Sequence, residues 1–221
     1  MEFVLPFLNA LVALPLTLLP IINPLSTAPV FVATAGRSQE VVQRLARQVA
    51  INSWYVIVAS MVLGTHVLAL FGLSLPVVRI GGGLLVAATG WRMLHHKEQD
   101  DVQVAAAHEA QVLSATEIVR RSFFPITFPL TTGPGTIAAA IALGTQIPRS
   151  PMLFVTGVLA AMVGAALTAV ILYLTFKHAG TLLERLGDIG TLVMMRMIAF
   201  LLLCIGIQFM FTGWAEFNAK P

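Results

Sequence analysis

Six long apolar stretches, joined by short connections, fill most of this chain of 221 residues. Hydrophobic residues make up 57% of the sequence and charged residues only 10%, whereas a soluble domain carries about 25% charged residues. A run of ~20 apolar residues is long enough to cross a lipid bilayer, where only a helix satisfies its own backbone. We therefore predict six membrane-spanning helices, over residues 3–35, 49–71, 75–94, 118–143, 152–176 and 191–217.

These stretches fit one compact unit, so the sequence predicts an all-α polytopic membrane protein with a single transmembrane domain over residues 1–221. The net charge of +3 does not indicate a nucleic-acid partner, because the Lys and Arg residues are spread over the connections. The single cysteine, Cys204, excludes a disulfide framework and a zinc site. The lipid bilayer is the expected partner, and a homo-oligomer is left open.

Basic residues gather in three of the connections, and by the positive-inside rule those connections face the cytoplasm. Both termini are then expected outside. The polar connection over residues 95–116 is the longest of the three, and its function is left open. The cations concerned are Arg37, Arg44, Arg47, Arg92, Lys97, Arg120, Arg121, Lys177 and Arg185.

The first and fourth stretches share an interruption by proline near their centres. Asn23-Pro24 interrupts the first, and Gly133-Pro134 interrupts the fourth. Proline donates no backbone hydrogen bond and is favoured at the first position of a helix, so each pair is predicted to end one helical segment and begin another. Backbone groups freed at membrane depth are tolerated only where they line protein or a watery cavity. The two breaks are therefore expected to line a site, although kinks that serve only packing are an alternative.

Similar features recur in the same order in the two halves. In the first half a broken stretch is followed by Arg79 at the start of the third stretch, and in the second half another is followed by Arg196 near the start of the sixth. This order predicts two three-helix repeats, residues 1–94 and 117–221, and an odd helix number inverts the second relative to the first. Half-helices beginning at Pro24 and Pro134 would then meet head to head.

A helix N-terminus carries partial positive charge and free N–H donors, which suit a carboxylate, while nearby hydroxyl oxygens suit an ammonium group or a cation. A zwitterion the size of an amino acid fits both. The predicted substrate-binding residues are Asn23, Pro24, Ser26, Thr27, Thr131, Thr132, Gly133, Pro134, Gly135 and Thr136. Residues predicted to pack or gate the helices are Arg79, Gly81, Gly82, Gly83 and Arg196.

The apolar stretches contain neither a nucleophile paired with a base nor an acidic pair, so an enzyme is not expected. No metal ligands have suitable spacing, and no cofactor is predicted. The acidic residues lie in connections or near helix ends, so a proton relay through a buried acid is not evident. His66 is the one titratable side chain within a stretch that could replace such an acid, and coupling to Na⁺ or H⁺ is left open.

The order of these motifs resembles the MarC family (UPF0056) of bacterial and archaeal inner-membrane proteins over essentially the whole chain. The resemblance rests on Asn23-Pro24-Leu25-Ser26-Thr27, on the run from Arg79 to Leu85 with Gly90 and Arg92-Met93-Leu94, on Thr132-Gly133-Pro134-Gly135-Thr136-Ile137, and on the run from Arg196 to Phe209. It implies a six-helix inner-membrane protein related to transporters of small neutral amino acids such as glycine and alanine. The family's signature positions correspond to Asn23, Pro24, Gly133, Pro134 and Gly135.

The leading hypothesis is a transporter of small neutral amino acids. The alternatives are a channel or exporter for another small solute, drugs included, and a membrane protein without a transport function, such as a scaffold that binds a partner through the polar connection. The family name refers to antibiotic resistance, but it does not establish drug efflux.

Overall fold

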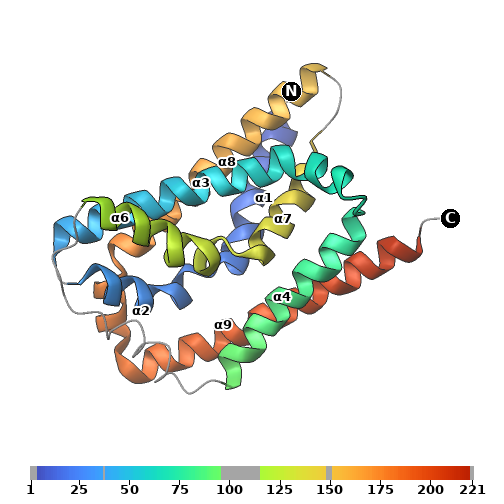
Figure 1. The fold of residues 1–221 in the computed structure, drawn as a ribbon. Coiled ribbons are helices and arrows are strands. Elements are labelled where there is room, and N and C mark those ends of the chain that lie inside the picture. Colours follow the sequence, from blue (N-terminus) through green and yellow to red (C-terminus); the bar gives the residue numbers. More distant parts are fainter. Residues whose placement is uncertain (1–3, 37, 96–114, 148–150, 220–221) are drawn as a thin grey trace.

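The computed structural model describes residues 4–36, 38–95, 115–147 and 151–219. Within these ranges the backbone is almost entirely helical and forms no strand, which confirms the all-helical prediction. Most of the connection over residues 95–116 lies outside the described residues, so its predicted place on the cytoplasmic side remains a prediction. The helices, labelled as in Figure 1, are α1 (Val4–Ile22), α2 (Pro24–Ala35), α3 (Gln39–Leu70), α4 (Leu75–His95), α6 (Ala115–Arg121), η1 (Ser122–Thr131), α7 (Pro134–Gly144), α8 (Pro151–Lys177) and α9 (Ala179–Asn218).

Four of these helices are long and apolar enough to cross a membrane by themselves. They are Gln39–Leu70, Leu75–His95, Leu153–Lys177 and Ile189–Asn218. Two further helix pairs are long enough only when their two helices are taken together, and each pair is bent. The bend is 60° between α1 and α2, and 71° between the 116–131 segment and α7. The described chain therefore has four straight spans, or six if each bent pair counts as one.

Two spans are longer than the apolar pattern predicts. Helix α3 begins at Gln39, ten residues before the predicted start at Val49. The extra turns are polar and carry an exposed ion pair, Glu40 Oε1 to Arg44 Nη2 at 2.7 Å. At ~1.5 Å per residue the 32 residues of α3 span ~48 Å, which exceeds an apolar bilayer core of ~30 Å. Hydropathy marks the part in lipid, whereas the helix itself continues into the polar zone.

Helix α9 also begins earlier than predicted, at Ala179, but it is interrupted at Gly187. Gly187 has a φ of 64°, a left-handed conformation that glycine adopts without steric cost. The part that qualifies as a span begins just beyond this kink, at Ile189.

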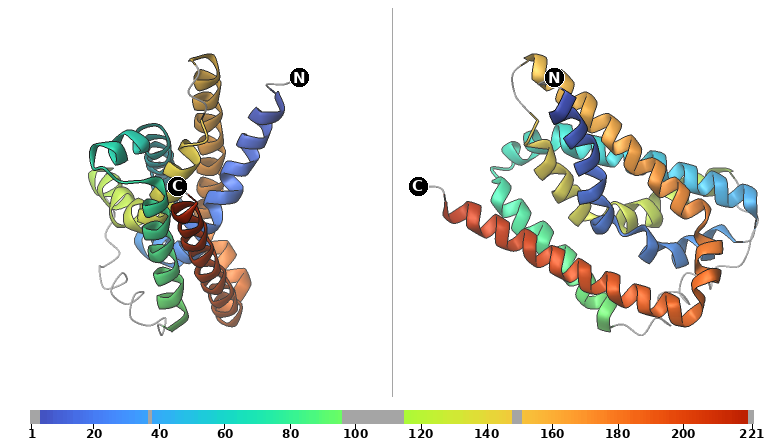
Figure 2. Two further views of the ribbon diagram at one scale, coloured as in Figure 1. Left: turned by 90° about the vertical axis from the view of Figure 1, so that its right-hand side faces the viewer. Right: turned by 180° about the vertical axis from the view of Figure 1, so that it is seen from behind.

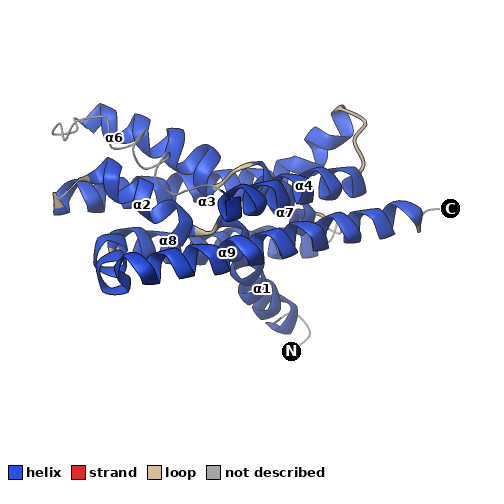
Figure 3. Cartoon of the chain, turned by 90° about the horizontal axis from the view of Figure 1, so that it is seen from below, coloured by secondary structure: helices blue, strands red, loops and turns tan. Residues whose placement is uncertain are grey.

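The helices pack as two units that meet at the broken pairs. Helix α4 lies along α9, and α3 lies along α8 with α1 on the other side of α8 (Figure 1). A view from behind shows α9 and α4 along one side of the molecule, with the short helices between them and α8 (Figure 2). Figure 3, from below, shows that the described elements are helices joined by loops. The core contains stacked Phe31 and Phe176 rings 4.8 Å apart, which join α2 to α8. Trp54 Nε1 donates to the Met162 carbonyl oxygen at 3.1 Å and joins α3 to α8.

Glycines bring the backbones of α4 and α9 into contact. A Cβ atom on Gly83 would lie 2.6 Å from the Gly206 carbonyl oxygen, and one on Gly90 would lie 2.6 Å from the Leu203 nitrogen. A Cβ on Gly206 would in turn collide with the backbone of Ala87. Small residues are the usual means of close helix packing in lipid, where no hydrophobic effect drives helices together.

Candidate functional site

The first break is a single residue, Asn23, between α1 and α2. Its φ of 47° and ψ of 65° place it in the left-handed region, where asparagine is among the few residues tolerated. Its N–H still donates to the Leu19 carbonyl oxygen at 2.9 Å, and Pro24 then begins α2. Asn23 Oδ1 accepts from Ser26 N at 3.3 Å, and Ser26 Oγ donates to the Asn23 carbonyl oxygen at 2.8 Å. Asparagine and serine together thus build the helix start that the sequence predicted.

The carboxamide nitrogen of Asn23 is the unusual group at this break. The residue is only 5% exposed, and its Nδ2 has no hydrogen-bond partner among the described residues. A buried donor without a partner costs roughly 1–3 kcal/mol, so its presence calls for an explanation. The Oδ1 atom already caps α2, which leaves the two N–H groups for a ligand that accepts hydrogen bonds.

The second break differs from the first and from its prediction. Residues Ser122–Thr131 form a π-helical segment, η1, rather than the α-helix expected over this part of the fourth stretch. Phe124 and Phe128, each followed by a proline, have extended backbone angles within it. The restriction that proline imposes on the preceding residue accounts for this, because it disfavours the α conformation there. Two closely spaced prolines therefore loosen the helix over the whole segment before the break.

Glycine is required where η1 ends and α7 begins. A Cβ on Gly133 would lie 2.4 Å from the Pro129 carbonyl oxygen, too close for any other residue. Gly133 is extended, with ψ near −178°, and Pro134 is the first residue of α7. No side chain caps this helix start. The free N–H groups of its first turn are therefore available to a ligand, and Pro134 beside them is exposed.

Four buried threonine hydroxyls lie around the second break. Each donates to the carbonyl oxygen five residues earlier in the sequence, and for Thr136 this bond crosses the break to Thr131. Because the hydrogen is used in this way, each oxygen keeps only acceptor capacity for a ligand. The donor to acceptor distances are 2.7 Å for Thr127, 2.7 Å for Thr131, 3.1 Å for Thr132 and 3.4 Å for Thr136, and none of the four residues is more than 3% exposed. Thr127 was not among the predicted site residues, because it precedes the run from Pro129 to Thr136 on which the prediction for the second break was based.

The two breaks lie near each other in the middle of the molecule (Figures 1 and 2). Helix α1 contacts α7, and α2 contacts η1, so the two broken pairs pack directly against each other. Helices α2 and α7 leave this region in opposite directions (Figure 1). Thr27 of α2 is 3% exposed, whereas Pro24, Ser26, Gly133 and Gly135 are half-buried. The predicted substrate-binding residues thus fall on the two bent helix pairs: at the start of α2 in the first, and at the end of η1 and the start of α7 in the second.

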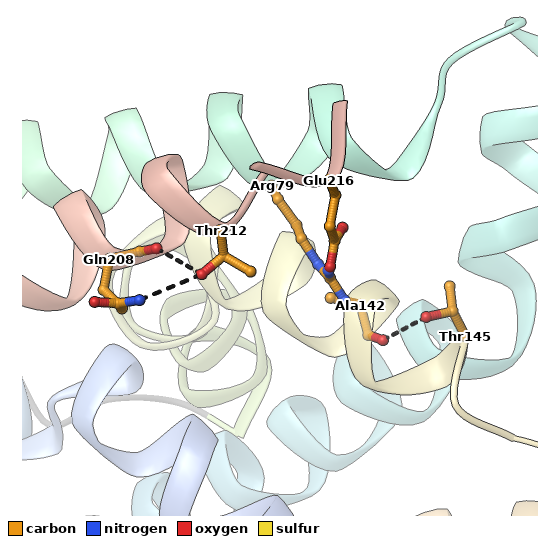
Figure 4. Close-up of polar contacts among 6 residues, drawn as sticks. All are labelled: Arg79, Ala142, Thr145, Gln208, Thr212 and Glu216. Atoms are coloured by element: carbon orange, nitrogen blue, oxygen red, sulfur yellow. Dashed lines mark hydrogen bonds and ion pairs between the residues drawn. The ribbon is translucent and has the colours of Figure 1, made fainter. Parts of the chain in front are cut away.

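The predicted packing residues separate into different environments. A Cβ on Gly82 would collide with Ala138 of α7, and one on Gly83 would meet α9, whereas Gly81 has open space around it. Arg79 forms an ion pair with Glu216 of α9, a partner that the sequence did not indicate (Figure 4). Arg196 is exposed on α9.

A separate cavity of about 590 Å³ lies between α3, the end of α7 and α8. Its lining includes Met61, Thr65, His66, Thr145 and Phe154. None of the predicted substrate-binding residues contributes to this lining. In the described part of the chain, no three His, Cys, Asp or Glu residues gather in a way that could hold a metal ion.

Comparison with known proteins places these features in a family. The model of the MarC family integral membrane protein matches residues 8–217. The UPF0056 inner membrane protein MarC of Escherichia coli strain K12 is 34% identical over 206 residues, which cover 90% of this chain and 91% of that protein. The protein of the same name from Shigella flexneri has the same identity and coverage. No solved structure matches the chain.

The family match covers α2, α4, α7 and α9 and the residues just before α2 and α7, so it includes all of the motifs on which the resemblance was based. It agrees with the long apolar helices and the two bent pairs of the structure. The chain is an integral inner membrane protein with several membrane-spanning helices, and it belongs to the MarC family.

Proposed function

We propose that this protein transports small neutral amino acids, of the size of glycine or alanine, across the inner membrane. The observation that carries the proposal is the pair of broken helices, whose second halves begin at Pro24 and Pro134 near the centre of the molecule. Interrupted helices in corresponding positions of two halves are the best pointer to a substrate site in transporters. Such a site does not require a catalytic residue or a cofactor.

The packing of the helices supports two equivalent halves. We exchange α1 with η1, α2 with α7, α3 with α8, and α4 with α9. The largest contacts between helices map onto one another, whereas the smaller contacts of α1 with α9, α2 with α3 and α8 with α9 have no counterpart of that size. Helix α4 contacts α7 as α9 contacts α2, and α1 contacts α8 as η1 contacts α3. The pairs α3 with α8 and α4 with α9 map onto themselves. This exchange is what two inverted repeats related by a pseudo-twofold axis would produce.

The polarity of the groups at the breaks favours a zwitterion. The uncapped N-terminus of α7 and the free Nδ2 of Asn23 both donate hydrogen bonds, which suits a carboxylate. The oxygens of Thr131, Thr132 and Thr136 accept them, which suits an ammonium group. The described half-helices α2 and α7 carry no charged side chain. A ligand with no net charge therefore matches the site better than an acidic or basic one.

Burial of the site sets the size of the substrate. Asn23, Thr27, Thr131, Thr132 and Thr136 are each 5% exposed or less. A long side chain on the ligand would have to displace these packed groups, whereas glycine or alanine adds little volume beyond its charged ends.

Transport is tested in liposomes that contain the purified protein. We expect uptake of labelled glycine and alanine well above that of empty vesicles, and unlabelled serine or leucine as competitors would report the size limit. Gradients of Na⁺ and of H⁺, imposed separately in both directions, would identify a coupling ion. Absence of flux under every gradient would refute the proposal. Single-channel currents in planar bilayers would instead show that the protein is a channel rather than a carrier.

Pro134→Ala is expected to lower glycine flux several-fold while the protein still inserts and folds. Alanine restores the N–H that proline lacks and removes its clash with the preceding turn, which favours a continuous helix by up to about 3 kcal/mol. The measurement is the initial rate of uptake per folded protein, judged by gel filtration. Pro29→Ala is the matched control, because Pro29 lies inside α2 rather than at a break, and it should leave flux near wild type. Equal rates in the two variants would contradict the function assigned to the break.

A further inference from the structure

The ion pair between Arg79 and Glu216 ties α4 to α9 at one end of their glycine contact. Arg79 lies in the second turn of α4, and its side chain is 14% exposed, while that of Glu216, near the end of α9, is 40% exposed. The pair joins residues 137 positions apart, whereas the pair of Glu40 with Arg44 lies within one helix and is 73% and 61% exposed. Gly213 permits this approach, since a Cβ there would lie 2.8 Å from the Pro76 carbonyl oxygen and 3.0 Å from the Arg79 Cβ.

Arg79 also belongs to the contact between α4 and α7. Gly135 of α7 lies against Val86 of α4, and Ala138 lies against Gly82, so the two helices run antiparallel along this contact. One turn further along each helix, Arg79 is level with Ala142, and Figure 4 shows the two in the same close-up. Arg79 and the Ala138 and Ala139 side of α7 line the same narrow space, with Phe209 of α9.

Ala142 belongs to the last turn of α7, which ends at Gly144. The carbonyl end of a helix carries partial negative charge and is stabilised by a nearby cation. Helix α7 has no basic residue of its own in that turn. Arg79 of α4, paired with Glu216 of α9, is a basic side chain that lines the space beside α7.

We infer that Arg79 is a positioning residue for the solute site: it clamps the last turn of α7 to α4 and α9, and so fixes where the opposite end of α7 points. Helix α7 is short, 11 residues or ~16 Å, so a tilt at its C-terminal end moves its N-terminus within the break. The effect on the site rests on the proposed transport function. The clamp itself is a statement about helix packing and can be tested without any substrate.

The clamp is tested by cysteine labelling in the purified protein. Cys204, the natural cysteine, is replaced by serine, and Ala142→Cys or Ala139→Cys is introduced as a reporter, because both alanines are buried. A water-soluble maleimide should label the reporters slowly in this background. Arg79→Gln and Glu216→Gln should each raise the labelling rate roughly tenfold, the change expected for loss of a charge-assisted bond. Glu40→Gln is the control and should leave the rate unchanged.

A double variant in which the two charges are exchanged tests whether the ion pair also holds α7 or only links α4 to α9. Arg79→Glu combined with Glu216→Arg restores an ion pair but places a carboxylate at the C-terminal end of α7, so we expect labelling to stay fast. Arg79→Lys keeps the cation and should protect the reporters in part. Full protection in the exchanged pair, or unchanged labelling in both glutamine variants, would overturn the inference.

Transport measurements then test the consequence for the site. Arg79→Gln is expected to raise the KM for glycine more than it lowers the maximal rate, because a displaced helix N-terminus binds the solute less well. An unchanged KM in a variant whose reporters label fast would overturn the link between clamp and site. If the wild-type protein carries no amino acid at all, the transport proposal fails while the labelling result still decides the clamp.

Discussion

Replacing Asn23 with glycine is expected to reduce kcat/KM for glycine transport by about 10- to 100-fold, the loss that follows when one hydrogen bond to a charged group is removed. The substitution deletes the only buried side-chain nitrogen without a partner in the described part of the chain. Glycine adopts the left-handed backbone of position 23 freely, and at a helix N-cap it costs only a few tenths of a kcal/mol. The measurement is the concentration dependence of uptake in liposomes, at matched amounts of folded protein.

Two control variants separate binding from folding. Asn23→Ala removes the same donor, but it also removes the Oδ1 cap of α2, and alanine tolerates the left-handed backbone less well than asparagine. It should therefore also lower the free energy of unfolding, by about 1–2 kcal/mol. Thr34→Val removes a hydroxyl that bonds to the Val30 carbonyl oxygen at the far end of α2, and it should leave transport unaffected. Wild-type kinetics in Asn23→Gly would show that the free Nδ2 does not contact the solute.

Gly83→Ala is expected to destabilise the folded protein by about 1–3 kcal/mol, the usual cost of forcing extra volume into a packed contact. The added Cβ would lie 2.6 Å from the Gly206 carbonyl oxygen and 2.7 Å from the Met210 nitrogen, which are backbone atoms that cannot rotate away. The helices α4 and α9 must therefore move apart where they now touch. Thermal unfolding in detergent, followed by the loss of the monodisperse gel-filtration peak, measures the effect.

Gly81→Ala is the matched control for this prediction. It lies two residues away on the same helix, and a Cβ added there would have nothing within 4 Å. Alanine is the better helix former by about 1 kcal/mol, so this variant should be as stable as the wild type or slightly more so. Equal destabilisation by both substitutions would mean that glycine acts through the flexibility of α4 rather than through close packing.

The helical class and the places of the two breaks were predictable from the sequence because they are local properties. Runs of apolar residues must form helices in lipid, whatever surrounds them. Proline ends a helix because it lacks an N–H, and it favours the start of the next because its φ angle is fixed. Helices α2 and α7 accordingly begin at the prolines of Asn23-Pro24 and Gly133-Pro134. The π-helical form of η1 was missed because it depends on how Pro125 and Pro129 act together on one segment.

Side-chain partners depended on tertiary structure. The triple glycine from Gly81 to Gly83 suggests one smooth face, yet Gly82 meets α7, Gly83 meets α9 and Gly81 meets nothing. A helix turns by about 100° per residue, so only the neighbouring helices decide which glycine is needed. The partner of Arg79 is 137 residues away in sequence. The side-chain nitrogen of Asn23 has no partner because no acceptor among the described residues is placed to form a hydrogen bond with it in the folded chain. Adjacent residues determine where the backbone is interrupted, whereas contacts between helices arise only when distant segments pack in three dimensions.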